Sequence, residues 1–304
     1  MVFEFSSATR LVFGEGVFER LGTEAAALGR RALIVTSARA MRASGHLDRA
    51  RALLDKAGVS CAVFDRIPPN PTDGIVDEGA ALAREYEADL VIGLGGGSAM
   101  DAGKAIAICA RHETPCRRFL EPDAAGNRAA VTAATLPVLC VTSTAGTASE
   151  LTPFAVITVT ATRDKSAIRS PHIQPRVSLD DPELTHSVPA NISAATGVDV
   201  LCHAMEAFVN LNAGPLTDLL ALEAVRLVGR YLPRVVADGS DREARRQMLL
   251  ANCYAGYGLA NAGATVMHAL EHPVSGHYPA VAHGAGLAAC VLPWARKMAA
   301  VAPD

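Results

Sequence analysis

The sequence predicts an α/β N-terminal domain, built on a Rossmann-like parallel sheet, followed by an all-α C-terminal domain. Short β-branched runs alternate with helical patterns over the first half of the chain, whereas nearly every stretch after residue 190 has helical periodicity. The chain has 304 residues, half of them hydrophobic, so each domain can bury a core. Pro182 and Pro189 punctuate the junction, and we place the two domains at 1–187 and 188–304.

Strands and helices alternate along the first domain. Apolar runs bounded by turn residues predict buried strands, and this alternation predicts a parallel sheet with helices on both faces. The expected strands are 32–37, 60–67, 88–98 and 136–144, and the expected helices between them are 46–58, 75–86 and 100–111. In the second domain, helices are expected at 193–210, 216–231, 241–259 and 264–273, with a short helix before the final VAPD.

Composition argues against several classes of protein. The formal net charge is −3 without a clustered basic excess, which disfavours a nucleic-acid partner. The seven cysteines are scattered and form no CxxC pair, so we expect buried thiols in a reducing cytosol. We find neither a signal peptide nor an 18-residue uniformly apolar stretch free of breakers. A cytoplasmic protein with no membrane partner is therefore expected.

Two loops that follow strands have the composition of a phosphate-binding site. In GLGGGSAMDAGKA (93–105), a phosphate could approach the backbone at Gly96, Gly97 and Ser98, beside the N–H groups of the following helix. A tight turn without a ligand is the alternative. The loop is not the GxGxxG fingerprint, so it does not by itself name a dinucleotide. TSTAGTASE (142–150) follows another strand and would open onto the same crevice.

Aspartate and histidine side chains recur at a spacing that suits a metal ion. Asp199 and His203 lie four residues apart on one expected helix, and His268 and His272 repeat that spacing on another. Residues four apart share a helix face, with about 5–6 Å between their Cβ atoms. His283 follows a glycine-containing turn. One carboxylate with imidazoles suits Fe(II) or Zn(II), and the lack of an aligned cysteine disfavours a structural zinc.

These five side chains exceed the four protein ligands expected of such a site, and spacing does not choose the one left outside. Ordinary packing in a core is the alternative for each histidine. Glu206 and Glu271 are the expected carboxylate partners of the ligands, although either could belong to a solvated helix face. We expect His277 to be a loop residue with no role.

Several segments resemble the iron-containing (group III) alcohol dehydrogenase family, in the family's order and over essentially the whole chain. GGGSAMDAGKAIA resembles its dinucleotide motif, and STAGTASELTPFAVIT resembles its second cofactor loop. GVDVLCHAMEAF and HALEHPVSGHYPAVAHG resemble its metal-binding segments, and PPNPT and FEFSSATRLVFGEGVFERLG match as well. The resemblance implies a dehydroquinate-synthase-like architecture, with a dinucleotide-binding domain, a helical metal-binding domain and an active site in the cleft between them.

The resemblance also implies a role for each candidate residue. His272 would be the proton relay beside the nicotinamide of NAD or NADP. The substrate oxygen would bind a divalent metal, Fe2+ or alternatively Zn2+, while hydride passes to or from the nicotinamide ring. The implied metal ligands are Asp199, His203, His268 and His283. The implied cofactor contacts are Asn70, Gly96, Gly97, Ser98, Thr144, Thr147, Phe154 and Lys165.

Ser37 ends a strand at a point where many NAD-using relatives carry an acidic residue. An acidic side chain there would bind the ribose 2′-hydroxyl and repel a 2′-phosphate. Because Ser37 has Arg39 and Arg42 close behind it, we include Ser37 among the cofactor contacts and expect relaxed preference between NAD and NADP.

The resemblance leaves other functions open. A maleylacetate reductase or a hydroxyacid–oxoacid transhydrogenase is one alternative, although maleylacetate-reductase-type sequences tend to lack this metal set. A lyase of the dehydroquinate-synthase type is another. Because family members usually continue past the point that corresponds to VAPD, we expect a shortened member or a fragment. An inert metal- or nucleotide-binding homologue is therefore a further alternative.

Family analogy also implies a homodimer. FEFSSATRLVF is expected to form an N-terminal hairpin that supplies the contact edge. The expected substrate is a small alcohol or aldehyde, which the residues do not name.

Overall fold

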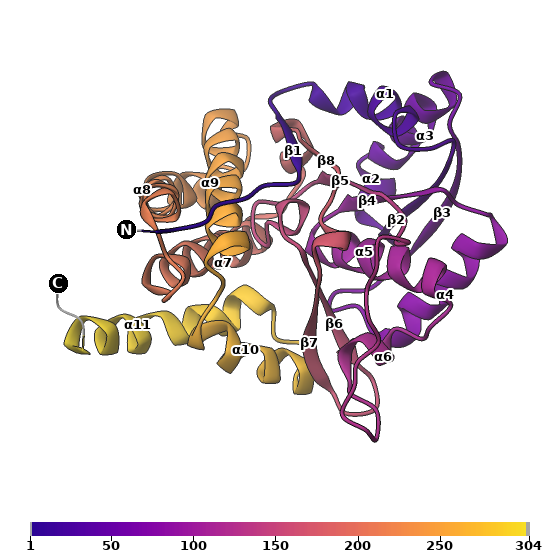
Figure 1. The fold of residues 1–304 in the computed structure, drawn as a ribbon. Helices are drawn as coiled ribbons and strands as arrows, with labels where there is room; N and C mark the ends of the chain where they lie inside the picture. Colours follow the sequence, from indigo (N-terminus) through magenta and orange to yellow (C-terminus); the bar gives the residue numbers. More distant parts are fainter. Residues whose placement is uncertain (1, 302–304) are drawn as a thin grey trace. The chain divides into compact units, whose positions relative to one another are not determined.

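The first half of the chain forms a six-stranded parallel sheet in the computed structural model, which describes residues 2–301 (Figure 1). The strand order is β1-β8-β5-β4-β2-β3, and every neighbouring pair is parallel. The predicted α/β fold class is therefore confirmed. The strands are β1 (Arg10–Phe13), β2 (Arg31–Ser37), β3 (Ser60–Ile67), β4 (Leu90–Gly95), β5 (Val138–Thr142) and β8 (Val177–Asp180).

Helices cover both faces of this sheet. They are α1 (Leu21–Ala26), α2 (Ala40–Ala43), α3 (His46–Lys56), α4 (Asp73–Glu85), α5 (Gly97–His112) and α6 (Arg117–Leu120). Alternate residues of a strand point to opposite faces. Leu33 and Val35 of β2 accordingly pack with α4 and α5, whereas Ala32 and Ile34 pack with α1 and α3.

Several strands differ from the sequence prediction in their pairing or were not predicted. β1 pairs in parallel with the distant β8, so FEFSSATRLVF is not a hairpin. A parallel pair requires a long crossover, which the local sequence does not show. β6 (Phe154–Val159) and β7 (Asp164–Arg169) form a separate antiparallel hairpin that was not expected. β8 has only four residues, too few for a periodic signal.

The second half of the chain is helical, as predicted. It contains α7 (Ala190–Val209), α8 (Pro215–Ala237), α9 (Arg242–Asn261), α10 (Val266–His277) and α11 (His283–Val301). α7, α8 and α9 share a core rich in small side chains, including Ala204 and Ala251, which let helices approach closely. A smaller core, which includes Cys202, Met267 and Leu287, joins α7 to α10 and α11.

Both C-terminal helices are longer than the sequence predicts. α10 continues through Pro273 to His277, so His277 ends a helix and does not lie in a loop. The prediction ended this helix at the proline because a proline removes a helical hydrogen bond. α11 has 19 residues where a short helix is predicted. The last residues of VAPD, 302–304, lie outside the described residues.

The bilayer and cysteine expectations are each met only in part. Within residues 2–301, α7 is long and apolar enough to cross a bilayer by length and composition, although no uniformly apolar stretch marks it. Half of that stretch is buried inside the protein, as in the core helix of a globular unit. The seven cysteines form no disulfide, but Cys61 and Cys290 are half-buried and not fully buried.

The chain divides into two compact units, which we describe separately. The α/β unit contains residues 7–144 and 149–187. The helical unit contains residues 188–301 together with 2–6 and 145–148. The loop 145–148 therefore belongs to the helical unit, although the residues on both sides of it belong to the α/β unit.

Candidate metal centre and cofactor loops

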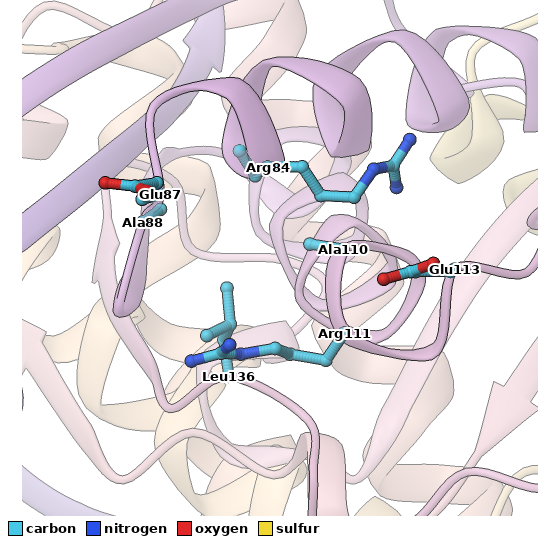
Figure 2. A pocket seen from close by; sticks show the side chains of 8 residues that line it. Arg84, Glu87, Ala88, Ala110, Arg111, Glu113 and Leu136 are labelled. Carbon is cyan, nitrogen blue, oxygen red and sulfur yellow. The ribbon is translucent and has the colours of Figure 1, made fainter.

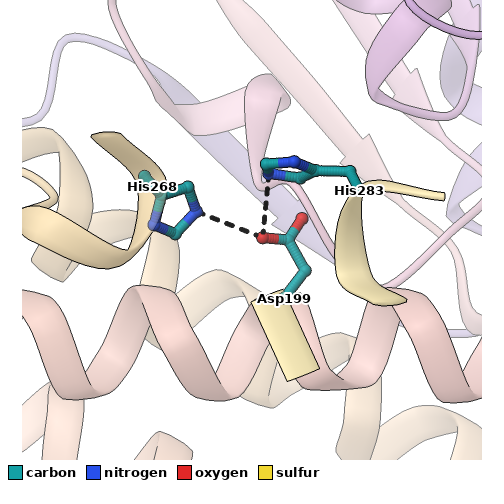
Figure 3. Close-up of side chains that lie close together, drawn as sticks. All are labelled: Asp199, His268 and His283. Carbon is teal, nitrogen blue, oxygen red and sulfur yellow. Dashed lines mark hydrogen bonds and ion pairs between the residues drawn. The ribbon is translucent and has the colours of Figure 1, made fainter. Parts of the chain in front are cut away.

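The four implied metal ligands converge in the helical unit. α7 carries Asp199 and His203 one turn apart, α10 carries His268, and α11 begins at His283. The Nε2 atom of each of the three histidine rings faces Oδ1 of Asp199. The distance from Nε2 to Oδ1 is 3.5 Å for His203, 3.4 Å for His268 and 3.7 Å for His283. Figure 3 shows His268 and His283 both directed at the Asp199 carboxylate.

Carboxylates set the orientation of two of the rings. Nδ1 of His268 contacts Oε2 of Glu206, and Nδ1 of His283 contacts Oε2 of Glu271. A carboxylate at Nδ1 fixes the ring and leaves Nε2 available to a metal. Oε1 of Glu206 also accepts backbone N–H groups at the start of α10, at 2.9 and 2.8 Å. Glu206 therefore fixes both the His268 ring and the helix that carries it.

His203 is positioned by packing. Its ring stacks on His268 with 4.5 Å between centroids and 11° between planes. Its Nδ1 is buried and has no hydrogen-bond partner among the residues that the structure describes. With the Asp199 carboxylate, the three Nε2 atoms form an N3O donor set, which suits Fe2+ or Zn2+. The residues present therefore fit a divalent transition metal.

The charged groups of this cluster shift one another's pKa. Burial alone would raise the pKa of Asp199, but His203, His268 and His283 hold it well below its usual value. Burial lowers the pKa of His203 to about 4. Burial also opposes charge on His268, yet Asp199 and Glu206 raise the pKa of that ring to about 9. Two carboxylates around one imidazole thus provide negative charge for a cation.

Two glycines allow α11 to place His283. A Cβ at Gly284 would lie 1.8 Å from the carbonyl oxygen of Ala195 in α7. A Cβ at Gly286 would lie 2.9 Å from Cγ of Glu271. The helix can therefore approach α7 and the Glu271 carboxylate only with glycine at these positions. Sequence reasoning does not single out either glycine, although both belong to the short stretch HGAG, which could have drawn attention to them.

His272 lies beside the ligand rings. Its ring centroid is 6.2 Å from that of His268 and 5.6 Å from that of His283. Glu271, His272 and His283 also have possible ligand atoms within 4.8 Å of one another, so they form a second candidate group. We favour the group around Asp199, because Glu271 already uses Oε2 on His283 and Oε1 on a serine hydroxyl of α10.

In the α/β unit, the predicted glycine loop joins β4 to α5. Gly96 is the N-cap of α5, so the free N–H groups of its first turn begin at Gly97 and Ser98. A Cβ at Gly96 would lie 3.3 Å from Oγ1 of Thr144. The N–H of Ser143 donates to the carbonyl oxygen of residue 95 at 3.0 Å. The two predicted cofactor loops therefore meet at the carboxyl ends of β4 and β5.

A buried ammonium and a partly buried carboxylate hold the second loop, and sequence reasoning misses both. The fully buried Lys104 ammonium donates to the carbonyl oxygens of Ser149, Thr152 at 2.9 Å and Phe154 at 2.7 Å. Asp101 accepts from the Ser149 hydroxyl at 2.5 Å and from a backbone N–H of β6 at 3.1 Å. Burial raises the pKa of Asp101 and lowers that of Lys104. Asp101 and Lys104 lie three residues apart on α5, and this spacing is the feature of the sequence that could have predicted the pair.

The remaining implied cofactor residues lie in the α/β unit, with one exception. The turn at Asn70, which has a φ of 53°, is joined to β6 by a 2.9 Å hydrogen bond from the N–H of Thr158 to the Pro71 carbonyl. Thr147 is the exception, because it lies in the loop 145–148 of the helical unit. Ser37 ends β2, Phe154 begins β6, and Lys165 is buried on β7.

A cavity of about 430 Å³ lies elsewhere in the α/β unit and holds none of the predicted site residues (Figure 2). Its lining includes Ala88 and Leu136, which precede β4 and β5, and residues near the ends of α4 and α5. Open parallel sheets bind ligands at the carboxyl ends of their strands, whereas this cavity lies at the amino ends. Its charged residues are Arg84, Glu87, Arg111 and Glu113.

Family models and curated proteins match both parts of the chain. The model for iron-containing alcohol dehydrogenase matches residues 8–182, and the model for the C-terminal part of the Fe-containing alcohol dehydrogenase family matches residues 193–303. The 1,3-propanediol dehydrogenase of Klebsiella pneumoniae is 38% identical over 269 residues, which are 88% of this chain and 68% of the relative. The NAD-dependent methanol dehydrogenase of Bacillus methanolicus is 36% identical over 268 residues, with the same coverage of 88% and 68%. The chain thus spans about two thirds of the length of these relatives.

Solved structures match over nearly the whole chain. An archaeal halo-thermophilic alcohol dehydrogenase from a Red Sea brine pool, bound to NZQ, has a TM-score of 0.93 and 38% identity over 98% of this chain and 76% of that chain. Sulfoacetaldehyde reductase from Bifidobacterium kashiwanohense, in complex with NAD+, has a TM-score of 0.89 and 32% identity over 98% of this chain and 77% of that chain.

Proposed function

Because the chain belongs to the iron-containing alcohol dehydrogenase family, we propose that it transfers hydride between a nicotinamide cofactor and an alcohol or the matching carbonyl compound. The observation that carries this proposal is the convergence of three imidazole Nε2 atoms on Oδ1 of Asp199, at 3.4 to 3.7 Å. Fe2+, or alternatively Zn2+, would supply Lewis acidity at the substrate oxygen. The proposed ligands are Asp199, His203, His268 and His283.

The proposed cofactor, NAD or NADP, binds in the domain 1–187 with its phosphates at the N-terminus of α5. The free N–H groups that begin at Gly97 and the positive end of the helix dipole favour an anion there. The NAD+ in sulfoacetaldehyde reductase and the NAD-dependent methanol dehydrogenase support a nicotinamide cofactor. The proposed contacts are Ser37, Asn70, Gly96, Gly97, Ser98, Thr144, Thr147, Phe154 and Lys165.

His272 is the proposed proton carrier in the domain 188–304. During oxidation an imidazole nitrogen of His272 would accept the hydroxyl proton of the alcohol and pass it to solvent. Its half-buried position, one turn beyond His268, supports this role because the ring stays close to the ligands while one side remains open to exchange.

Elemental analysis combined with an absorbance screen tests the proposal. Protein purified with and without oxygen should contain iron or zinc, and it should reduce NAD or NADP with at least one alcohol. Protein that remains free of metal and shows no nicotinamide turnover after reconstitution would contradict the proposal. Metal-dependent chemistry without net nicotinamide turnover would instead indicate a lyase of the dehydroquinate-synthase type.

A metal- or nucleotide-binding protein without turnover is a second candidate. The observation that favours it is an exposed apolar stripe on α10, formed by Val266, Leu270 and Val274. Within residues 2–301, the helix that carries His268 is therefore not covered along this apolar side. Calorimetric binding of NADH without alcohol oxidation would select this candidate, and ordinary turnover would eliminate it.

We also propose a homodimer. β1 lies at the edge of the sheet, where it pairs with β8 and offers its other side to a second strand. Light scattering after gel filtration should give the mass of two chains. A mass of one chain at micromolar concentration would contradict this assignment.

A further inference from the structure

Asn252 holds the loop 145–148 from within the helical unit. It lies on α9, and its side chain is fully buried. Oδ1 accepts the N–H of Gly146 at 2.8 Å and the N–H of Ala148 at 3.1 Å. One carbonyl oxygen thus binds the amides on either side of Thr147. Buried amides without an acceptor would be unfavourable, so these two bonds decide the path of the loop.

The loop has a conformation that its own residues do not favour. Ala148 has a φ of +49° and is buried. An L-residue with a side chain rarely adopts this left-handed region, and it persists there only when the surroundings hold it. The hydrogen bond from Ala148 to Asn252 is such a restraint.

The same loop lies directly against the helix that carries the metal ligands. A Cβ at Gly146 would lie 2.8 Å from Cβ of Thr196, which precedes Asp199 by three residues on α7. Ala145 packs on the core that contains Val200 of the same helix. No side chain separates the loop from α7 at Gly146, so a shift of the loop changes its position relative to the metal ligands.

We infer that Asn252 is a positioning residue, which holds Thr147 at a fixed place beside α7 and so fixes the contact that Thr147 makes with the nicotinamide cofactor. This inference rests on the proposed function, in which Thr147 contacts the cofactor. Asn252 acts through the loop and touches neither cofactor nor substrate in this role. Its loss should therefore change cofactor binding and hydride transfer and should leave metal binding unchanged.

Asn252→Ala is the test, with Asn252→Asp as the conservative variant. Losing two buried hydrogen bonds of about 1 kcal/mol each should raise the KM for the nicotinamide cofactor about ten- to thirtyfold. The metal content should stay at the wild-type value, and the isotope effect on kcat with deuterated alcohol should rise. Asn252→Asp retains an acceptor oxygen, so its KM should stay within about threefold of wild type.

Asn261→Ala is the matched control, because Asn261 also lies on α9. Its side chain bonds Tyr257 at 2.9 Å and the N–H of Ser6 at 2.7 Å, away from the loop. A merely structural role would lower the yield of folded protein in both variants with KM and the isotope effect unchanged. If Asn252→Ala does not fold, Gly146→Ala, which collides with Thr196, should give the same rise in KM with unchanged metal content.

Measurements on the wild type separate this inference from the proposed function. Wild-type protein that neither binds NADH by calorimetry nor turns over alcohol would overturn the proposed function and this inference together. Normal wild-type turnover with an unchanged KM and isotope effect in the Asn252→Ala or Gly146→Ala variant would overturn the inference alone. A raised KM accompanied by loss of metal would also overturn it, because the effect would then arise at the ligands.

Discussion

The carboxylate of Glu206 contacts Nδ1 of His268, the ring nitrogen opposite the one that faces Asp199. The same carboxylate accepts two backbone N–H groups at the start of α10. Side-chain orientation and helix placement at the metal centre therefore depend on one buried acid.

Glu206→Gln should lower metal affinity about 10- to 100-fold, the range found when the carboxylate partner of a ligating histidine is changed. The amide would present either a second donor or a weaker acceptor to the ring. A competitive titration with a metal chelator measures the change. Glu223→Gln on α8, where the carboxylate only meets Arg226 at the surface, is the control and should leave affinity unchanged. Equal affinity in the Glu206 and Glu223 variants would contradict this role.

His272→Ala should keep its metal and lose rate, whereas His268→Ala should lose both. Removing a general acid–base typically slows a reaction about 10²- to 10⁴-fold. Metal content by elemental analysis and kcat with one alcohol are measured on the same preparations. Loss of metal from the His272 variant would place that ring among the ligands and make the group of Glu271, His272 and His283 the better description.

The repeated elements of the fold can be read from the sequence, and the local exceptions cannot. β2, β4 and β5 follow from apolar runs because each is buried on both faces, and β3 follows from its run although, at the edge of the sheet, it is only partly buried. β1 pairs with a strand far along the chain, so its partner leaves no local pattern. α10 continues past Pro273 because tertiary packing outweighs the local preference for a break.

The same distinction applies to the candidate site, where local spacing can be read from the sequence and long-range contacts cannot. Spacing predicts that Asp199 and His203 share one helix face, and the structure places them so, whereas only the packing of α10 against α7 brings His268 to Asp199. Distance in sequence conceals other contributions. Lys104 and Asn252 act on loops more than 40 residues away, through contacts that exist only in the folded chain.

Gly284→Ala should displace His283 and weaken metal binding. The new Cβ would lie 1.8 Å from the carbonyl oxygen of Ala195. Because the atoms that it meets belong to the backbone of α7, no side chain can move to make room for it. Gly229→Ala on α8 is the control, because a Cβ there meets nothing within 4 Å. That change should raise the free energy of unfolding by at most about 1 kcal/mol. Thermal denaturation with and without added metal checks both variants. A Gly284 variant whose melting temperature still rises normally with metal would contradict the packing argument.

Lys104→Met should destabilise the protein by about 3–5 kcal/mol, the usual result of removing one partner of a buried charged pair. The substitution leaves Asp101 and the carbonyl oxygens of the second loop without the ammonium. Urea denaturation measures the difference. Lys56→Met at the exposed end of α3 should change stability by no more than about 0.5 kcal/mol. A small effect for both lysines would mean that water or another donor replaces the Lys104 ammonium.

Ser37→Asp should shift the cofactor preference towards NAD. Ser37 ends β2 on the side of the sheet where the glycine loop begins, so a carboxylate there would accept the ribose 2′-hydroxyl and repel a 2′-phosphate. Of the two nearby arginines, Arg42 donates to Asp65 at 2.8 Å, which leaves the exposed Arg39 as the cation for a 2′-phosphate. We expect kcat/KM for NADP to fall at least about tenfold relative to NAD, since 1.4 kcal/mol of repulsion suffices for that ratio.

The control is Ser60→Asp, at the amino end of the neighbouring β3. It adds the same charge at the opposite end of the strands and should leave the ratio unchanged. Wild-type protein that already uses NAD alone would contradict the expected relaxed preference, because Ser37 would then have no part in cofactor choice.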